Sequence, residues 1–178
     1  DKKAHKVLAR LSEEFDAPVL EVGVRDAQMI KYASNAFLGV RVSFINEIAA
    51  ACEAIGADVV NVAEGMGYDK RIGRDYLRAG PGFSGPCLVK DLLALIFFSR
   101  EGGVAPVLLE AALERNRKQL EWVLSRTAEA AGGLKGKRIG LLGLAFKPDT
   151  SDVRNSIAML VVRKLLEEGA EVAAYDPK

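Results

Sequence analysis

The chain of 178 residues carries 25 basic and 24 acidic side chains, so it has almost no net charge with which to attract nucleic acid or an anionic membrane. Its hydrophobic content of 49% and charged content of 28% are typical of a globular protein and exclude a disordered one. The longest apolar run, Leu92 to Phe98, is far shorter than the roughly twenty residues that span a bilayer. We therefore expect no nucleic-acid partner and no membrane partner.

The counts of cysteine and histidine restrict the chemistry further. Cys52 and Cys87 are too few for a disulfide framework, and we expect a reducing, cytoplasmic setting. The single histidine, His5, lies in a polar segment near the N-terminus, so neither a Cys-His pair nor a zinc site of cysteine and histidine is expected. If a cysteine is catalytic, its helpers must be lysine, asparagine, carboxylate or backbone groups.

The first half of the chain is predicted to be mainly helical. Residues 1–15 carry apolar side chains at helical spacing, and residues 18–24 are typical of a short strand. From residue 26 an apolar stripe continues to Ile55, and Gly56 is positioned to end this long helix. Because one neighbouring element cannot cover so long a stripe, we expect a homodimer through this helix. A shorter helix is predicted over residues 58–67.

The second half begins with another long helix, from about Pro106 to the glycine pair at 132–133. The pattern then changes to a buried strand, a helix over residues 156–168 and a second strand over 171–176, which is one β-α-β unit. The predicted fold class is mainly α, a central helical domain followed by a Rossmann-like β-α-β fragment. The expected domain boundaries are 1–24, 25–133 and 134–178.

A cysteine on a glycine-rich loop is the clearest chemical signal. In Gly80-Pro-Gly-Phe-Ser-Gly-Pro-Cys87 the thiol comes directly before a helical run, where unpaired N–H groups and the helix dipole favour the thiolate. Asp91 follows one turn later on the same face. The alternative is a turn that contains a small buried hydrophobe. Cys52, inside the long helix, is interpreted as core.

Polar residues on the long helix could serve the same site. Lys31 and Asn35 lie one turn apart, displaced from the apolar stripe, and could bind an oxyanion or a substrate hydroxyl. A solvated helix face is the alternative reading for this pair, and the same two readings apply to Arg41 and to Asn46-Glu47.

The turn Gly140-Leu-Leu-Gly143-Leu-Ala145, with Asp176 at the end of the next strand, is similar to a dinucleotide fingerprint. It lacks the central glycine that lets a pyrophosphate lie against the backbone, so it predicts an NAD site only weakly. Lys147 and Arg154 follow the turn and can hold phosphate oxygens, which favours a nucleotide diphosphate at this edge.

Together these motifs resemble the UDP-glucose/GDP-mannose dehydrogenase family over nearly the whole chain. Residues 27–47 (AQMIKYASNAFLGVRVSFINE) are similar to its central helix, and residues 69–91 to its R-I-G…G-x-G-F-x-G-x-C-x-x-K-D catalytic segment. Residues 140–178 are similar to the opening of its C-terminal nucleotide-sugar domain. The resemblance implies that residues 1–24 are the end of the family's N-terminal NAD-binding domain.

The family oxidises the C6 alcohol of a nucleotide sugar to a carboxylate with two molecules of NAD. The resemblance implies that Cys87 attacks the aldehyde, that Lys31 and Asn35 stabilise the oxyanion, and that Asp91 positions or deprotonates water. It further implies substrate contacts from Gly82, Phe83, Gly85, Lys147, Arg154 and, across a dimer interface, Arg41, and a cofactor contact from Lys90.

The identity of the sugar stays open. Ser84, Pro86 and Val89 depart from the family's usual residues around the cysteine, while the Lys-Asp pair after it favours UDP-glucose. UDP-N-acetylmannosamine and GDP-mannose are the alternatives. The parent protein is expected to be an enzyme, whereas this chain alone is expected to lack turnover. A non-catalytic dimerisation module is the competing class of function.

Overall fold

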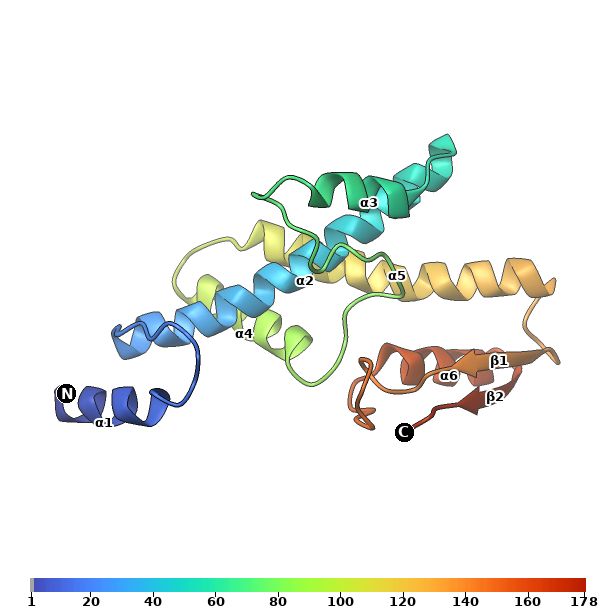
Figure 1. The fold of residues 1–178 in the computed structure, drawn as a ribbon. Helices are drawn as coiled ribbons and strands as arrows, with labels where there is room; N and C mark the ends of the chain where they lie inside the picture. Colours follow the sequence, from blue (N-terminus) through green and yellow to red (C-terminus); the bar gives the residue numbers. More distant parts are fainter. Residues whose placement is uncertain (1) are drawn as a thin grey trace.

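The computed structural model describes residues 2–178 and contains six helices and two strands in that range (Figure 1). In chain order they are α1 (Lys2–Ser12), α2 (Val24–Ile55), α3 (Val59–Gly67), α4 (Leu88–Glu101), α5 (Val107–Ala131), β1 (Arg138–Leu142), α6 (Ile157–Glu167) and β2 (Glu171–Tyr175). The predicted class, a mainly helical part followed by a small β-α-β unit, is confirmed.

The long helix α2 is the centre of the molecule, and α4 and α5 pack against it (Figure 1). It ends where the sequence predicted, because Gly56 takes the left-handed conformation with φ 75°, which glycine adopts at little cost. The Asp58 side chain then caps α3 by accepting a hydrogen bond of 2.8 Å from the N–H of Val60. This cap lets α3 fold back beside the C-terminal half of α2.

A hydrophobic core joins α2 and α4. Its buried members are Ala36, Phe83, Leu92 and Ile96. Leu92 is fully buried, and removing such a side chain from water stabilises a fold by about 1.5–3 kcal/mol. On the neighbouring helix pair, the buried hydroxyl of Ser43 donates a 2.7 Å hydrogen bond to the carbonyl of Ala112 and so links α2 to α5.

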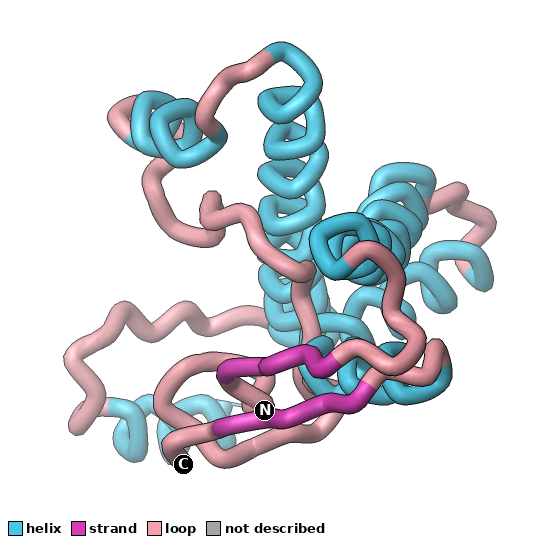
Figure 2. The backbone as a smooth tube through the Cα atoms, turned by 90° about the vertical axis from the view of Figure 1, so that its right-hand side faces the viewer, coloured by secondary structure: helices cyan, strands magenta, loops and turns pink. Residues whose placement is uncertain are grey.

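Strand β1, helix α6 and strand β2 form a C-terminal unit, which packs beneath the second half of α5. Strands β1 and β2 are parallel, with Ile139 opposite Val172, and Figure 2 shows the two strands side by side. Helix α6, capped by the Ser156 side chain, buries Val161 and Leu165 against the strands and against apolar residues of α5. The start of α5 therefore contacts the central helices, whereas its end carries the β-α-β unit.

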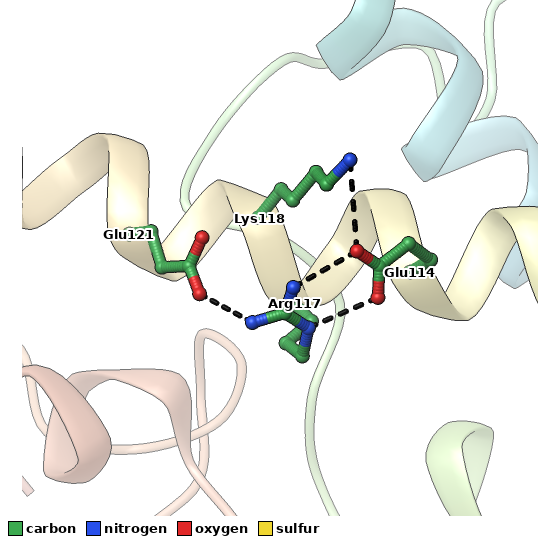
Figure 3. A network of polar contacts seen from close by, with 4 residues as sticks. All are labelled: Glu114, Arg117, Lys118 and Glu121. Carbon is green, nitrogen blue, oxygen red and sulfur yellow. Dashed lines mark hydrogen bonds and ion pairs between the residues drawn. The ribbon is translucent and has the colours of Figure 1, made fainter.

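Helix α5 carries a charged network of four side chains, Glu114, Arg117, Lys118 and Glu121 (Figure 3). Arg117 hydrogen-bonds Glu114 and Glu121, three residues before it and four after it, and Lys118 lies 3.6 Å from Glu114. Hydrogen bonds from Arg117 lower the pKa of Glu114 to about 2 despite the opposing effect of desolvation. The network keeps its own face of α5 polar and leaves the opposite face for the core and the site.

The strand predicted at residues 18–24 is wrong. Pro18 to Gly23 has no regular structure, and Val19 and Leu20 are exposed. A strand needs a hydrogen-bonding neighbour, and within residues 2–178 none is available to this segment. In the same range no helix has both the length and the apolar character needed to cross a bilayer.

Candidate active site

Cys87 lies at the N-terminal cap of α4 and is exposed, in agreement with the position predicted for it. The backbone turns there into the helix, and the N–H of Asp91 donates a 2.8 Å hydrogen bond to the Cys87 carbonyl. Cys87 lines a cavity of about 400 Å³, the cysteine cavity, together with Asn35 of α2 and Lys147 of the C-terminal unit. Three segments distant in sequence thus meet around the thiol.

Asp91 is the buried charge of the site, with only 3% of the residue exposed. Its carboxylate accepts a 2.5 Å hydrogen bond from Asn35 Nδ2 and another from the ammonium of Lys90, and Lys31 Nζ lies 3.8 Å away. Burial alone would raise the pKa of Asp91, but the hydrogen bonds from Lys90 and Asn35 and the two nearby positive charges together hold it below its usual value. The carboxylate is therefore ionised at neutral pH.

The lysines on either side of Asp91 keep their charged ends in solvent. The side chains of Lys31 and Lys90 are 63% and 66% exposed. The hydrogen bond to Asp91 raises the pKa of Lys90. The structure thus gathers Lys31, Asn35 and Lys90 around Asp91, and of these residues Asn35 lines the cysteine cavity with Cys87.

Two glycines of the cysteine loop occupy positions where any side chain would be strained. Gly82 has φ 115°, and a Cβ there would lie 2.5 Å from Oδ1 of Asn116. Gly85 has φ 89°, and a Cβ would lie 2.4 Å from the Phe146 ring. The N–H of Gly85 also donates a 3.0 Å hydrogen bond to the Asn155 carbonyl. The loop is therefore held against the C-terminal unit by close approach of its backbone.

Phe83 differs from its expected setting, because its side chain is buried in the core between α2 and α4. Its ring lies against Gly39, where a Cβ would be 3.4 Å from the ring edge. Phe83 still contributes to the wall of the cysteine cavity. It anchors the loop to the helices as well as bordering the site.

A larger cavity of about 790 Å³ lies between residues 78–84 and the ends of β1 and β2. It adjoins the cysteine cavity, since Gly82, Phe146 and Lys147 line both. Its charged lining residues are the cations Arg78, Lys147 and Lys178 and the carboxylates Asp149 and Asp176, of which Asp176 already accepts backbone hydrogen bonds. The volume and the cations suit a ligand with a sugar-sized part near Cys87 and an anionic part beyond it.

The turn after β1 does not fit a dinucleotide. Asp176 Oδ2 accepts hydrogen bonds from the N–H groups of Leu144, at 2.6 Å, and Ala145, at 3.0 Å. These and a third backbone bond, from Lys178, lower the pKa of Asp176. The N–H groups that would bind a pyrophosphate are occupied by a carboxylate of the chain itself, and the central glycine is missing. This turn therefore offers no NAD site.

Two expected substrate residues have other partners in this chain. Arg41 donates hydrogen bonds to the carbonyls of Ile72, at 2.7 Å, and Gly73, at 3.1 Å. Among the described residues 2–178, Arg41 lines neither the cysteine cavity nor the larger cavity. Arg154 forms an exposed ion pair of 2.7 Å with Asp152, although it lies within electrostatic range of Cys87. Lys147, in contrast, borders both cavities.

Three amides hold the loop; Asn116 and Gln119 were not predicted, and Asn46 was considered only as either a functional residue or part of a solvated helix face. Asn46, Asn116 and Gln119 hydrogen-bond the backbone of Gly80 or Phe83. The available signal was their pattern, since Asn116 and Gln119 are polar residues three apart on α5, beside the partly buried Leu113 and Leu120. Phe146, whose ring meets Gly85, was also missed.

The comparisons with known proteins agree with this geometry. The sequence model of the central domain of the UDP-glucose/GDP-mannose dehydrogenase family matches residues 25–118, and that of the family's UDP binding domain matches residues 140–178. The chain is 46% identical over 175 residues to the UDP-glucose 6-dehydrogenase TuaD of Bacillus subtilis, covering 98% of this chain and 38% of that protein.

Solved structures of similar proteins have the same fold. A UDP-glucose dehydrogenase from the archaeon Pyrobaculum islandicum superposes with a TM-score of 0.95 at 43% identity, over 99% of this chain and 41% of that one. A UDP-D-ManNAc dehydrogenase from Pyrococcus horikoshii superposes with a TM-score of 0.84 at 26% identity, over 99% of this chain and 42% of that one. The chain spans about two fifths of the relatives it matches, and it belongs to the UDP-glucose/GDP-mannose dehydrogenase family.

Proposed function

We propose that this chain supplies the nucleophile and much of the substrate site of an NAD-dependent nucleotide-sugar 6-dehydrogenase, with UDP-glucose as the favoured substrate. The observation that carries the proposal is the exposed Cys87 thiol in a cavity with Asn35 and Lys147, next to the larger cavity lined by cations. Family membership and the names of the relatives give additional support. The expected division into residues 1–24, 25–133 and 134–178 is part of the proposal.

NAD, when bound, supplies the hydride acceptor for both oxidations. Because the turn after β1 does not fit a dinucleotide, we assign the main NAD site to the part of the parent protein outside this chain. Lys90 is the one contact proposed from residues 2–178, since its side chain is exposed and within electrostatic range of Cys87. The chain alone is then expected to bind nucleotide sugar without turnover.

Cys87 is the covalent nucleophile of the second oxidation, for which NAD is the oxidant. Loss of a hydride and a proton from the C6 alcohol gives the aldehyde, and the Cys87 sulfur forms a bond to its carbonyl carbon. The oxygen becomes an oxyanion, which the charge of Lys31 and the amide of Asn35 stabilise. Loss of a hydride from the thiohemiacetal gives a thioester on Cys87. Water then breaks the C–S bond, which releases the carboxylate and restores the thiol.

Asp91 is proposed to orient water and the two amine groups rather than to act as a strong base. A carboxylate whose pKa lies below its usual value takes up protons poorly at neutral pH. Its negative charge instead compensates Lys31 and Lys90 and fixes the Asn35 amide. In the hydrolysis the proton of the attacking water can pass to the departing Cys87 thiolate, so Asp91 is proposed only to orient that water.

The nucleotide is proposed to lie in the larger cavity. Lys147 borders both cavities and could hold the diphosphate while the sugar C6 approaches Cys87. The match of residues 140–178 to a UDP binding domain favours a uridine nucleotide. UDP-N-acetylmannosamine and GDP-mannose remain the alternative substrates.

A homodimer through α2 is the proposed assembly. Within one chain, the apolar stripe of this helix leaves Met29, Ile30, Phe37 and Phe44 exposed. A second copy could cover them and could accept Arg41 near its own nucleotide. A non-catalytic dimerisation module is the second candidate function of the isolated chain, and it rests on this same exposed face.

The test is a steady-state assay of NADH formation with the complete parent enzyme and with this chain alone. The proposal expects UDP-glucose-dependent NADH from the complete enzyme, with a higher kcat/KM than for UDP-N-acetylmannosamine or GDP-mannose. It expects none from the chain. A complete enzyme that reduces no NAD with any of the three sugars would disprove it.

A further inference from the structure

We infer that Asn46, Asn116 and Gln119 form an amide clamp that positions the Gly80–Phe83 segment, and through it the nucleotide sugar and Cys87. Each of the three is a positioning residue, because it acts on the backbone of the loop. The inference deepens the proposed function and rests on it for the identity of the substrate.

Both backbone polar groups of Gly80 are held by side-chain amides. The N–H of Gly80 donates a 2.8 Å hydrogen bond to Oδ1 of Asn46 on α2. The carbonyl of Gly80 accepts a 2.8 Å hydrogen bond from Nε2 of Gln119 on α5. The segment is thus fixed between two helices at its first residue.

Phe83 is held in the same way by a single side chain. Its N–H donates a 2.8 Å hydrogen bond to Oδ1 of Asn116, and its carbonyl accepts a 2.9 Å hydrogen bond from Asn116 Nδ2. The Asn116 amide therefore makes the same two hydrogen bonds to the Phe83 backbone that a residue of a neighbouring β-strand would make. It also approaches Gly82 so closely that a Cβ there would lie 2.5 Å from Asn116 Oδ1.

The clamp leaves buried polar atoms without partners, which indicates that it serves more than helix packing. Asn46 is 1% exposed and Gln119 is 4% exposed. Among residues 2–178, Asn46 Nδ2 and Gln119 Oε1 are buried and have no hydrogen-bond partner. Burying a polar atom without a hydrogen bond lowers the stability of the fold, and an apolar side chain of similar size at the α2–α5 contact would avoid that loss. Asn46 and Gln119 instead fix the position of Gly80 through their hydrogen bonds to its backbone.

The two ends of the clamp face different parts of the proposed site. Gly80 lines the larger cavity, proposed for the nucleotide, and Phe83 lines the cysteine cavity. The chain then runs through Gly85, whose N–H bonds the Asn155 carbonyl, to Cys87. Loosening Gly80 should therefore weaken nucleotide binding, whereas loosening Phe83 should misplace Cys87 against the sugar.

The experiment uses the complete enzyme that contains this chain, with UDP-glucose, UDP-N-acetylmannosamine and GDP-mannose as substrates. Gln119→Met removes the bond to Gly80 and one unpaired atom while keeping the volume. We expect KM for the preferred sugar to rise about tenfold with kcat little changed, because the loss of one hydrogen bond has about this effect. Asn116→Ala removes two bonds and should lower kcat about ten- to a hundredfold. Asn116→Asp keeps the acceptor for the Phe83 N–H and should fall between Asn116→Ala and the unaltered enzyme.

Ser43→Ala is the matched control, since it removes a buried hydrogen bond between α2 and α5 that does not reach the loop. It should lower the melting temperature without changing kcat or KM. Hydrogen exchange at the amides of Gly80 and Phe83 gives a readout that needs no turnover. We expect much faster exchange at Phe83 in Asn116→Ala, which removes the acceptor of its N–H, and a smaller increase in Asn116→Asp, which keeps that acceptor. Gln119→Met should speed exchange at Gly80 indirectly, because it frees the Gly80 carbonyl while the N–H keeps its bond to Asn46. Exchange at both amides should be unchanged in Ser43→Ala.

The outcomes separate the clamp from the proposed function. If the unaltered enzyme oxidises none of the three sugars, the proposed function fails, and the exchange data still decide whether the clamp exists. If the Asn116 and Gln119 variants match Ser43→Ala in exchange, the clamp is disproved. An active enzyme whose clamp variants loosen the loop but keep their kcat and KM would also overturn the inference. Faster exchange with the KM and kcat split described above would support it.

Discussion

Asn35 Nδ2 donates a hydrogen bond of 2.5 Å to Oδ2 of Asp91, which joins α2 to the first turn of α4 across 56 positions of sequence. The proposed oxyanion binder and the proposed water-positioning carboxylate are therefore each held by the other. A change at either residue must affect both proposed steps, oxyanion stabilisation and thioester hydrolysis.

The first prediction concerns Asn35. In the complete enzyme, Asn35→Ala should lower kcat about a hundred- to a thousandfold, the effect of removing one oxyanion donor. Asn35→Asp should be at least as damaging, because a second carboxylate beside Asp91 would raise the pKa of one of the two. Steady-state kinetics measure both variants. An Asn35→Ala enzyme with more than half of the normal kcat would contradict the assignment.

The second prediction concerns acid stability. Because the folded state holds the pKa of Asp91 below its usual value, this carboxylate stabilises the fold at pH values above its unfolded pKa of about 3.9. The contribution is lost as the pH falls below that value towards the folded pKa. Urea unfolding at several pH values should show Asp91→Asn less stable than the unaltered protein at pH 6, with the gap closing below about pH 4. A gap that is independent of pH would show that the ionised carboxylate does not contribute.

The third prediction concerns the backbone of the cysteine loop. Gly85→Ala should destabilise the protein by about 1–3 kcal/mol, because it combines a left-handed φ with a clash against the Phe146 ring. Gly65→Ala is the control, since it lies inside α3 with open space around it and should be neutral or slightly stabilising. Thermal unfolding of the two variants decides, and equal melting temperatures would be inconsistent with the close packing seen at Gly85.

Much of the fold could be predicted because its signals are local. The left-handed Gly56, the Asp58 cap and the β-α-β pattern fix the helix ends and the parallel strands from neighbouring residues alone. The strand at residues 18–24 could not be judged in this way, since a strand depends on a partner elsewhere. Sequence spacing alone predicted that Lys31 and Asn35 lie one helical turn apart, and that Asp91 lies one turn after Cys87 on the same face.

The remaining parts of the site depend on long-range contacts that spacing does not reveal. That Asn35 meets Asp91 is set by the packing of α4 on α2, and it was expected only from the family resemblance. Asn116 and Gln119 escaped notice because an amide on a helix is usually solvated, and only the path of the loop gives it a backbone partner. Arg41 hydrogen-bonds backbone carbonyls of its own chain, and its proposed role across a dimer rests on the family resemblance.

The fourth prediction concerns thiol reactivity. Iodoacetamide should modify Cys87 much faster than Cys52 at neutral pH. Cys87 is exposed and within electrostatic range of Lys90 and Arg154, whereas Cys52 is only 5% exposed. Peptide mapping after timed alkylation measures the two rates, and Cys87→Ser serves as the control for assignment. Equal rates at the two cysteines would count against Cys87 as the accessible, reactive thiol of this chain.

The most direct test of the central claim is the product analysis of Cys87→Ser in the complete enzyme with UDP-glucose and NAD. The account predicts slow alcohol oxidation but no release of the acid, because an ester at position 87 hydrolyses poorly in a site built for a thioester. The unaltered enzyme should form two NADH for each carboxylate, a ratio fixed by the two oxidations. Normal acid formation by Cys87→Ser at the unaltered rate would contradict the proposal that Cys87 is the nucleophile.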